Sequence, residues 1–574
     1  MRIVRRPVPE RVEWQLTQQG VSPLCARLFA ARGVTSAAEL AYEASALLPP
    51  QALMGARQAA MLLADALAAN ARLLIVADYD CDGATACAVG LRALRALIQA
   101  GESQATVDYL VPDRFVLGYG LSPAIVTLAA QRFQPDLILT VDNGIASLEG
   151  VAAARKLGIA TLVTDHHLPA LKDGAPCLPD ADCIVNPNQP GCDFPSKSLA
   201  GVGVIYYVML ALRAELRERG WFRGRPEPNL GNLLDLVALG TVADVVRLDH
   251  NNRILVSQGL RRIRAGHLCC GLRALLAAAG REAQRLSVFD LGFVLGPRIN
   301  AAGRLADMGI GIECLLAEEP ARALALAQKL DALNRERREI ETGMQEQALA
   351  ILDRLDLAAA APAGMALFEP EWHEGVVGLL ASRVKDRLHR PVFAFAPSGS
   401  GELKGSGRSI PGLHLRDALD LMSKRAPGLL LRFGGHAAAA GVTVRREDFP
   451  LFRDLFADIA DELLPPEALA RQLETDGSLE SGYCNLATTH LLESHVWGQG
   501  FAAPVFDDTF TIEWQRILKE KHLKLRLRKE AFSIDAIQFN FTTTPAQSAH
   551  IAYRLGINNY KGIESPQLLI EHLA

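Results

Sequence analysis

The chain places three carboxylates at alternating positions directly after a hydrophobic run, in the stretch DYDCDG at residues 78–83. They belong to Asp78, Asp80 and Asp82. Carboxylates this close together repel one another unless a cation lies among them. Taken alone, the stretch fits a solvated turn as well as a metal site, so its meaning depends on the rest of the chain.

Two later apolar runs also end in residue types that bind metals. Asp142 follows the run at residues 137–141, and Asp165, His166 and His167 follow the run at 159–164. Carboxylate mixed with imidazole suits Mn²⁺ or Mg²⁺ better than a thiol-preferring metal. Two such ions about 3.5–4 Å apart, bridged by a shared carboxylate, activate water and stabilise the leaving oxygen in phosphoryl hydrolysis. Three acidic run ends therefore favour a metal site over a solvated turn.

A fourth acid, Asp244, lies in an apolar helical pattern at residues 232–248. Burying an unpaired carboxylate is costly. Asp244 therefore either accompanies a cation or lies on an exposed face, and the pattern alone leaves both possibilities open.

The elements that must position these residues follow from hydrophobic periodicity. Predicted strands are residues 71–80, 135–144, 159–167 and 182–188. Predicted helices between them are residues 83–99, 121–133 and 147–158. This alternation predicts a parallel sheet covered by helices on both faces. Ligands of such sheets bind beyond the carboxyl ends of the strands, which is where the acids lie.

The chain of 574 residues is too long for one core. The expected parts are an N-terminal segment (1–50), a catalytic domain (51–315), a long connecting helix (316–358), a smaller α/β domain (359–462) and a C-terminal β domain (463–574). The last part alternates polar and apolar residues, which is typical of an antiparallel barrel or sandwich.

The composition is that of an ordinary globular protein, with 49% hydrophobic residues, 22% charged residues and a formal net charge of −4. Its ten cysteines include no CxxC pair, which argues against a zinc ribbon and a disulfide framework. No apolar run reaches the roughly 18 residues that suggest a membrane span. We expect a cytoplasmic protein.

Three further stretches could contact phosphate. GPRINAAGRLADM at 296–308 places Arg298 and Arg304 on an expected Gly/Asn-rich turn. Guanidinium groups suit phosphate oxygens, although solvated arginines near a helix cap would give the same pattern. ELKGSGRSIPG at 402–412 supplies Ser406 and Arg408, together with Lys404, but lacks the spacing of a Walker A loop.

RFGGHAAAAG at 432–441 supplies Gly434, Gly435 and His436 before an expected helix of small residues. Backbone without side chains can approach a nucleotide closely, although Gly-Gly-His is also a common tight turn.

Near the C-terminus, three cations alternate with leucines: Lys524, Arg526 and Arg528. Strand geometry would place them on one face, with Trp514 and Phe539 available for stacking. The combination suits an OB-type groove for single-stranded nucleic acid. The alternative is an ordinary solvated face.

The motifs DYDCDGAT, VDNG, TDHH and ALGTVADVV, in this order, resemble those of the DHH phosphoesterase superfamily. Downstream, WHEGVVGLLASRVKDRLHRPVFAFA, LKGSGRS and RFGGHAAAAGVTV are similar to the associated DHHA1 domain. The motif order, the total length and the terminal β domain resemble the single-strand-specific exonucleases of this superfamily, over nearly the whole chain beyond residue 50.

The resemblance implies a role for each residue. One ion would be held by Asp78 and Asp80, the other by Asp82, His166 and Asp244, with Asp142 bridging the two. His167 would face the scissile phosphate, and Asp165 would support both imidazoles. Ser406 and Arg408 resemble a pocket for a 5′-terminal phosphate, to which Arg298 or Arg304 would contribute. The glycines at 434–435 and His436 would let the nucleotide approach the backbone.

The implied activity is 5′→3′ hydrolysis of single-stranded DNA to 5′-mononucleotides, with two Mn²⁺ or Mg²⁺ ions, in repair and recombination. The implied protein is a monomer that works with single-strand-binding protein and a helicase. One alternative is a DHH phosphodiesterase that acts on short oligoribonucleotides or cyclic dinucleotides. Such proteins resemble the first two domains but generally lack the barrel. The other is a non-catalytic replisome scaffold, but here every acidic and histidine motif position is filled.

Overall fold

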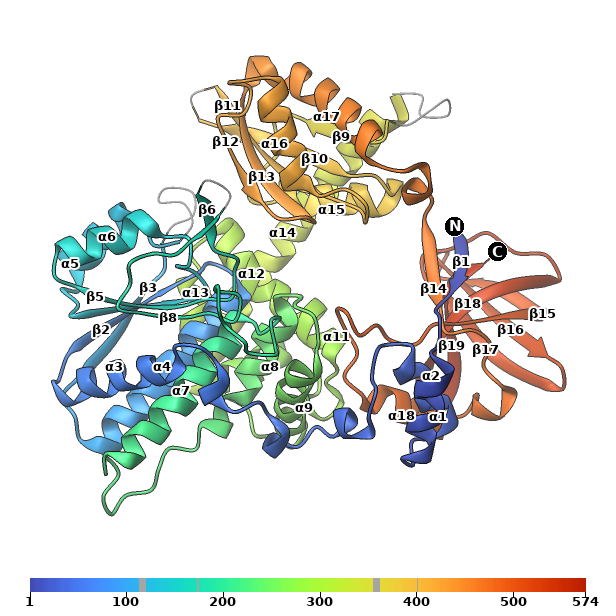
Figure 1. The fold of residues 1–574 in the computed structure, drawn as a ribbon. Helices are drawn as coiled ribbons and strands as arrows, with labels where there is room; N and C mark the ends of the chain where they lie inside the picture. The colour runs from blue at the N-terminus through green and yellow to red at the C-terminus, as the bar shows by residue number, and fades with distance from the viewer. Residues whose placement is uncertain (113–119, 173–174, 355–361, 400, 574) are drawn as a thin grey trace. The chain divides into compact units, whose positions relative to one another are not determined.

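The computed structural model describes residues 1–112, 120–172, 175–354, 362–399 and 401–573. The chain forms two compact units, and each is described by itself (Figure 1). Unit 1 consists of Met1–Val4 and Ala332–Glu474, and unit 2 of Arg5–Asp331 and Thr475–Ala574. None of the described helices combines the length and the apolar character needed to cross a membrane.

A parallel sheet of five strands underlies the catalytic part of unit 2. In spatial order its strands are β3 (Thr106–Leu110), β2 (Arg72–Ala77), β4 (Leu137–Val141), β5 (Ala160–Thr164) and β8 (Cys183–Val185). All neighbours run parallel, which confirms the predicted α/β fold. Four strands were predicted, and β3 adds a fifth at one edge. The order of strands reverses between β2 and β4, and sheets of this type bind ligands at such a switch point.

Helices cover both faces of this sheet (Figure 1). On one face α5 (Pro123–Arg132) and α6 (Leu148–Lys156) pack over Leu74, Val76 and Ile138. The other face is covered by α3 (Ala56–Ala68), α4 (Cys81–Gly101) and α7 (Gly201–Glu218). Strand side chains point alternately to the two faces, so a strand covered on both sides is apolar at nearly every position. A small ribbon of β6 (Ala170–Lys172) and β7 (Ala175–Cys177) follows β5.

A helical region completes the catalytic part. Its helices are α8 (Leu234–Ala243), α9 (His250–Arg264), α10 (Cys270–Ala278), α11 (Val288–Asp290), α12 (Gly296–Leu305) and α13 (Gly309–Leu316). A π-helical turn at Leu291–Leu295 joins α11 to α12. The turn expected at residues 296–308 is wrong for most of its length. Burial of Ile299, Ala301 and Ala302 on one face stabilises a helix there despite the glycines.

The long connecting helix is present as α14 (Pro320–Arg354), which starts in unit 2 and continues into unit 1. The expected boundary at 358/359 lies outside the described residues. The sheet of unit 1 has the order β12 (Arg432–Gly435), β13 (Ala439–Arg445), β11 (Glu402–Arg408), β10 (Val392–Ser398) and β9 (Met365–Phe368). Three helices pack against this sheet: α15 (Val377–Leu388), α16 (Leu415–Arg425) and α17 (Phe449–Leu463).

One expectation for unit 1 is wrong. The small residues after His436 lead into strand β13 rather than a helix, and Gly434 and Gly435 end strand β12 directly before the turn that joins the two strands. Ala440, Val442 and Val444 alternate with less buried neighbours in β13, so the small residues have the period of a strand.

A closed barrel ends the chain, with strands in the order β15 (Phe506–Leu518), β16 (His522–Lys529), β17 (Phe532–Gln538), β19 (Ile563–Leu573) and β18 (Ser548–Tyr560). Its interior contains Leu523, Leu525 and Leu527, as the alternation predicted. Helices α2 (Pro23–Ala30) and α18 (Leu486–Ser494) pack against the barrel, and α1 (Glu10–Gln18) packs against α2. Strand β1 (Arg2–Arg5) pairs with β14 (Gln472–Thr475) in a separate two-stranded sheet.

Candidate active site

The three aspartates after β2 lie in the turn that starts α4. Asp80 is the N-cap of this helix, and its Oδ1 accepts the N–H of Gly83 at 3.0 Å. Asp82 lies in the first helical turn and is fully buried. The N–H of Cys81 donates to Oδ1 of Asn300 on α12 at 2.7 Å. The turn is therefore held by its own cap and by a second helix.

The N-terminus of α7 holds the Asp82 carboxylate. Oδ2 accepts the N–H of Gly201 at 2.6 Å, and Oδ1 accepts the N–H of Val202 at 2.9 Å. Burial and the nearby charge of Asp80 nevertheless raise the pKa of Asp82 to about 7. A neighbouring cation would relieve this cost of ionisation.

Asp142 ends β4 in a left-handed backbone conformation with φ of 61°. Burial, followed by the charges of Asp82 and Asp80, raises its pKa well above the ordinary range. A methyl group on Gly201 would lie 2.6 Å from this carboxylate, so the start of α7 can approach it only with glycine there. Asp82 and Asp142 are thus both packed against the same helix end.

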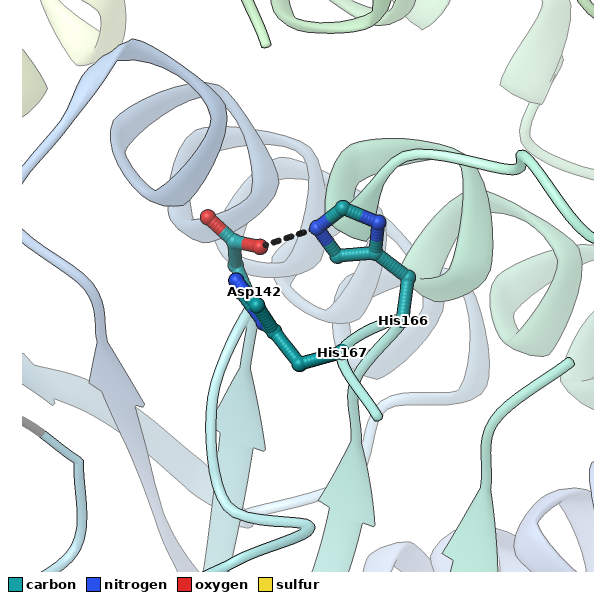
Figure 2. Close-up of side chains that lie close together, drawn as sticks. All are labelled: Asp142, His166 and His167. Atoms are coloured by element: carbon teal, nitrogen blue, oxygen red, sulfur yellow. Dashed lines mark ion pairs between the residues drawn. The ribbon is translucent and has the colours of Figure 1, made fainter. Parts of the chain in front are cut away.

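His166 stands between two carboxylates. Its Nε2 lies 3.1 Å from Oδ1 of Asp142, as Figure 2 shows, and 3.4 Å from Oδ2 of Asp244. Asp244 is the C-cap of α8, whose preceding turns are almost entirely buried. Burial and the charge of Asp82 raise the pKa of Asp244 well above its usual value. The structure thus places Asp244 beside the other acids, which the sequence pattern had left open.

Asp165 orients the histidine pair. Its Oδ1 accepts the backbone N–H of His166 at 2.7 Å and of His167 at 3.1 Å, and lies 2.7 Å from Nδ1 of His167. Burial acts to lower the pKa of His167, but the hydrogen bond and charge of Asp165 outweigh it and raise the pKa to about 9. Asp165 thus orients the ring of His167 and favours its protonated form.

These residues form three overlapping groups whose ligand atoms lie within 4.8 Å of one another. The groups are Asp78, Asp80 and Asp142; Asp82, His166 and Asp244; and Asp142, His166 and His167. Carboxylate and imidazole donors suit Mn²⁺ or Mg²⁺. Divalent cations would relieve the crowding of these acids, whose pKa values are raised, so this donor set fits such ions.

In unit 1, Ser406 and Arg408 lie on strand β11 beside the start of α15. Nη1 of Arg408 donates to Oγ of Ser406 at 3.1 Å and to the carbonyl of Gly407 at 2.8 Å. Burial lowers the pKa of this guanidinium, and among the described residues no carboxylate lies within ion-pair distance of it. A methyl group on Gly378, in the first turn of α15, would lie 2.9 Å from Oγ of Ser406 and 3.0 Å from Nη2 of Arg408.

The other glycine stretch lies in the same sheet. Gly441 of β13 pairs with Ser406 on one side and with Gly434 on the other, so Gly434 is two strands away from Ser406. Gly435 has a φ of 142°, and the N–H of His436 donates to the carbonyl of Ala439 at 2.8 Å. Both glycines therefore lie on the edge strand of this sheet, and His436 follows them. Strand β13 separates this edge strand from the strand that carries Ser406.

The two predicted phosphate-binding arginines of unit 2 lie on α12. Arg298 is buried, and its Nη2 lies 2.9 Å from Oδ1 of Asp331 on α14. Its Nη1 also donates to the carbonyl of Val294 at 2.6 Å. Arg304 is half-buried in the last turn of α12. Arg298 is thus already neutralised by a partner, whereas the sequence suggested an open phosphate contact.

The barrel cations point away from the leucine-filled interior, but all are paired with acids. Asp535 lies 3.2 Å from Nζ of Lys524 and 2.9 Å from Nη1 of Arg526. Glu513 lies 3.7 Å from Nε of Arg528. The outer face is therefore less basic than its cations alone suggest.

Comparison with known proteins follows the same division of the chain. The models of the DHH family N-terminal domain, the DHHA1 domain and the RecJ OB domain match residues 72–241, 360–462 and 475–572. The single-stranded-DNA-specific exonuclease RecJ of Dickeya dadantii is 51% identical over 561 residues, 96% of each chain. The protein of the same name from Escherichia coli is 49% identical over 562 residues, again 96% of each chain.

The chain belongs to the RecJ family of single-stranded-DNA-specific exonucleases. Among solved structures, RecJ of Thermus thermophilus in complex with Mn²⁺ matches with a TM-score of 0.81 and 30% identity, over all of this chain and 79% of that one. The same protein in complex with Mg²⁺ matches with a TM-score of 0.75. Membership of the RecJ family sets aside the short-oligonucleotide and scaffold alternatives.

Several residues that build this RecJ site carry no catalytic signature in the sequence. Gly201 and Gly378 matter because other side chains pack against them. Asn186 and Asn188 donate to the carbonyls of His167 and His166 at 2.9 and 2.6 Å and so fix the histidine backbone. A glycine immediately before an apolar helix was the available signal for Gly201, while the asparagines stood in an ordinary turn.

Proposed function

We propose that the chain hydrolyses single-stranded DNA from its 5′ end and releases 5′-mononucleotides with the help of two divalent cations. The observation that carries this proposal is the convergence of Asp78, Asp80, Asp82, Asp142, His166 and Asp244 at the sheet's switch point. Membership of the RecJ family supports the substrate class.

Two of the three spatial groups support the proposed ligand division. Asp78 and Asp80 would hold one ion together with Asp142, and Asp82, His166 and Asp244 would hold the other. Asp142, whose Oδ1 lies 3.1 Å from Nε2 of His166, would contact both ions. Bound there, divalent cations would supply activation of water and stabilisation of the leaving oxygen. Asp82 is suited to its role because both of its oxygens are already oriented by backbone N–H groups of α7.

His167 would bind the scissile phosphate rather than act as a base. Its Nδ1 is directed to Asp165, whose hydrogen bond and charge outweigh burial and raise the pKa of the ring. A ring N–H of His167 would donate to a phosphate oxygen as a charge-assisted hydrogen bond. Asp165 holds this orientation and preserves the charge.

Unit 1 would bind the terminal phosphate. Arg408 has no acidic partner among the described residues, Ser406 adds a hydroxyl, and the N-terminus of α15 adds its dipole. An anion would compensate the buried guanidinium, which supports 5′-end recognition by this group. Gly434, Gly435 and His436 would allow the nucleotide to approach the neighbouring sheet edge.

The remaining contacts are proposed for the DNA backbone: Arg298, Arg304, Lys524, Arg526 and Arg528. Those with acidic partners would exchange a carboxylate for phosphate, which reduces their net contribution to affinity. Single-strand-binding protein and a helicase as partners, and a monomeric state, stay predictions from the family resemblance.

One digest tests the proposal. Single-stranded, duplex and RNA substrates, labelled at the 5′ or the 3′ end, are incubated with the full chain and Mn²⁺. The expected result is immediate release of a labelled mononucleotide from 5′-labelled single-stranded DNA and progressive shortening of the 3′-labelled strand. Release of the 3′ label first, or equal rates on duplex, would contradict it.

A further inference from the structure

Two phenylalanines are exposed on the helical segment that leads into α12. Phe289 and Phe293 are 60% and 66% accessible. Their rings stack on each other, with centroids 4.8 Å apart and planes inclined by 21°. Most large aromatic residues of a folded protein are largely buried. A stacked pair of exposed aromatic side chains is therefore a candidate binding site for a ligand.

The backbone that presents them is irregular for an identifiable reason. Phe293 lies in the π-helical turn Leu291–Leu295, directly before α12. Pro297 has no N–H to give to the carbonyl of Phe293, and its ring crowds that carbonyl, so the helix widens ahead of it. Such π turns are often found at functional sites. Residues four apart lie on one side of a helix, which brings the two rings together.

This helical segment packs against chain neighbours of the candidate metal ligands at two points. A methyl group on Gly292 would lie 3.2 Å from Val242, and one on Gly296 3.0 Å from Ala243, so the segment packs on the turn of α8 that ends at Asp244. Further along, Asn300 accepts the N–H of Cys81 between two of the aspartates. At 1.5 Å per residue, Phe293 lies about 10 Å along the axis from Asn300.

A further exposed apolar side chain follows one of the acids in the chain. Val245 follows Asp244 directly, is 62% exposed and has a φ of 62°. A left-handed conformation is strained for a β-branched residue and persists where the surroundings impose it. Asp290 is the acid nearest to the rings in sequence. It accepts a hydrogen bond from Oγ of Ser287 at 2.7 Å and forms an ion pair with Arg281 at 3.3 Å. Its charge is therefore partly compensated and does not set the chemistry of the surface.

We propose that Phe289 and Phe293 form a stacking platform for an unpaired base of the DNA strand, a few nucleotides from the bond that is cut. The inference rests on the proposed function, because it takes single-stranded DNA as the substrate. An aromatic face stacks on any base whose own face is free. Bases within a duplex are stacked on both sides, so the platform favours single strands and adds to substrate selectivity.

The test is equilibrium binding with the metal removed by EDTA, which needs no catalysis. The full chain is titrated into fluorescent single-stranded DNA oligonucleotides in which one abasic site is moved stepwise from the 5′ end. The wild type is expected to lose about fivefold to 100-fold in affinity when the abasic site reaches one or two particular positions. The Phe289→Leu/Phe293→Leu variant is expected to bind the intact strand that much more weakly and to show no loss at those positions.

Leucine keeps the site apolar and close in volume, so the variant is expected to fold, and its thermal melting checks this. Leu157→Ala, which removes another exposed apolar side chain, is the matched control and is expected to bind all strands like the wild type. A double variant that binds as the wild type does overturns the proposal. Equal weakening on intact and abasic strands also overturns it, since the contact would then not be with a base.

The binding titration and the nuclease digest together distinguish failure of the platform from failure of the proposed function. If the wild type shows the position-specific abasic effect but releases no 5′ label with Mn²⁺, the platform stands and the exonuclease proposal fails. If label is released and no abasic position matters, the exonuclease proposal stands and the platform is overturned.

Discussion

At the scale of single residues, the site is a set of carboxylates whose ionisation the fold opposes. Burial and mutual repulsion raise the pKa values of Asp82, Asp142 and Asp244. Acidic side chains that bind no cation are usually exposed to solvent or spaced apart. Here their repulsion becomes binding free energy when cations enter, so metal affinity and pH must be linked.

The linkage has a definite sign. Asp82 has a pKa of about 7 in the folded chain and an ordinary value of 3.8. A raised folded-state pKa gives a stability contribution that is complete below about pH 4 and disappears as pH rises to about 7. Mn²⁺ binds the deprotonated site and reverses the loss. The increase in melting temperature caused by Mn²⁺ should therefore grow from pH 5 to pH 8, measured by calorimetry in matched buffers. An increase that does not change with pH would refute this.

Gly201→Ala should disable the site without removing a ligand. The added methyl group would lie 2.6 Å from Asp142 and displace either this carboxylate or the start of α7. Misplacement by about 1 Å can cost about 100-fold in rate. We expect such a loss of nuclease activity together with weaker Mn²⁺ binding by titration calorimetry. Gly343→Ala, where nothing lies within 4 Å, should keep both unchanged.

At the scale of elements, two helix N-termini are used for anionic groups. The start of α7 binds the Asp82 carboxylate, while the start of α15 lies beside Ser406 and Arg408. The helix dipole favours negative charge at both ends. The first is satisfied within the protein, whereas the second has no carboxylate of its own among the described residues.

Gly378→Ala should therefore weaken recognition of a 5′-phosphate. The methyl group would lie 3.0 Å from Nη2 of Arg408 and occupy part of the space for the anion. Charged hydrogen bonds contribute about 1.5–3 kcal/mol, or about tenfold to 100-fold. We expect the rate advantage of 5′-phosphorylated over 5′-hydroxyl strands to fall by that factor, measured with single-turnover digests. An unchanged ratio would show that the phosphate is bound elsewhere.

At the scale of the whole molecule, the functions are distributed over separate units. The residues of the metal groups belong to unit 2, while Ser406 and Arg408 belong to unit 1, and α14 runs from one into the other. The barrel is a further part of unit 2, and its cations are paired with acids. Changes in one part should therefore alter one property of the reaction at a time.

The barrel variant Lys524→Ala/Arg526→Ala/Arg528→Ala tests this division. If the three cations bind phosphates, the slope of log affinity against log salt should fall by about 0.7 for each cation lost, or about 2 in total. Mn²⁺ binding and cleavage of very short strands should stay as in the wild type. Asp535→Asn, which frees two of the cations, should change affinity in the opposite direction. An unchanged salt slope in the triple variant would remove the barrel cations from the DNA-binding surface.

Much of the fold could be predicted because its signals are local. Hydrophobic periodicity located β2, β4, β5 and β8, the helices between them, the long α14 and the leucine face of β16. The prediction failed at residues 296–308 and 439–445, where small residues and glycines suit several conformations and tertiary packing chose the helix and the strand. Composition is a weak guide at such places, because the backbone conformation is decided by what packs against it.

The sequence by itself determined which acids and histidines the chain offers and that parallel strands would bring their carboxyl ends to one edge. Only the tertiary structure decided whether Asp244 joins them, that Asp331 takes Arg298, and that Phe289 and Phe293 stay exposed. The reason is physical. Periodicity arises from neighbours along the chain, whereas the contacts that form this site join residues as far as 33, 119 and 219 positions apart. Such contacts depend on packing of the whole unit.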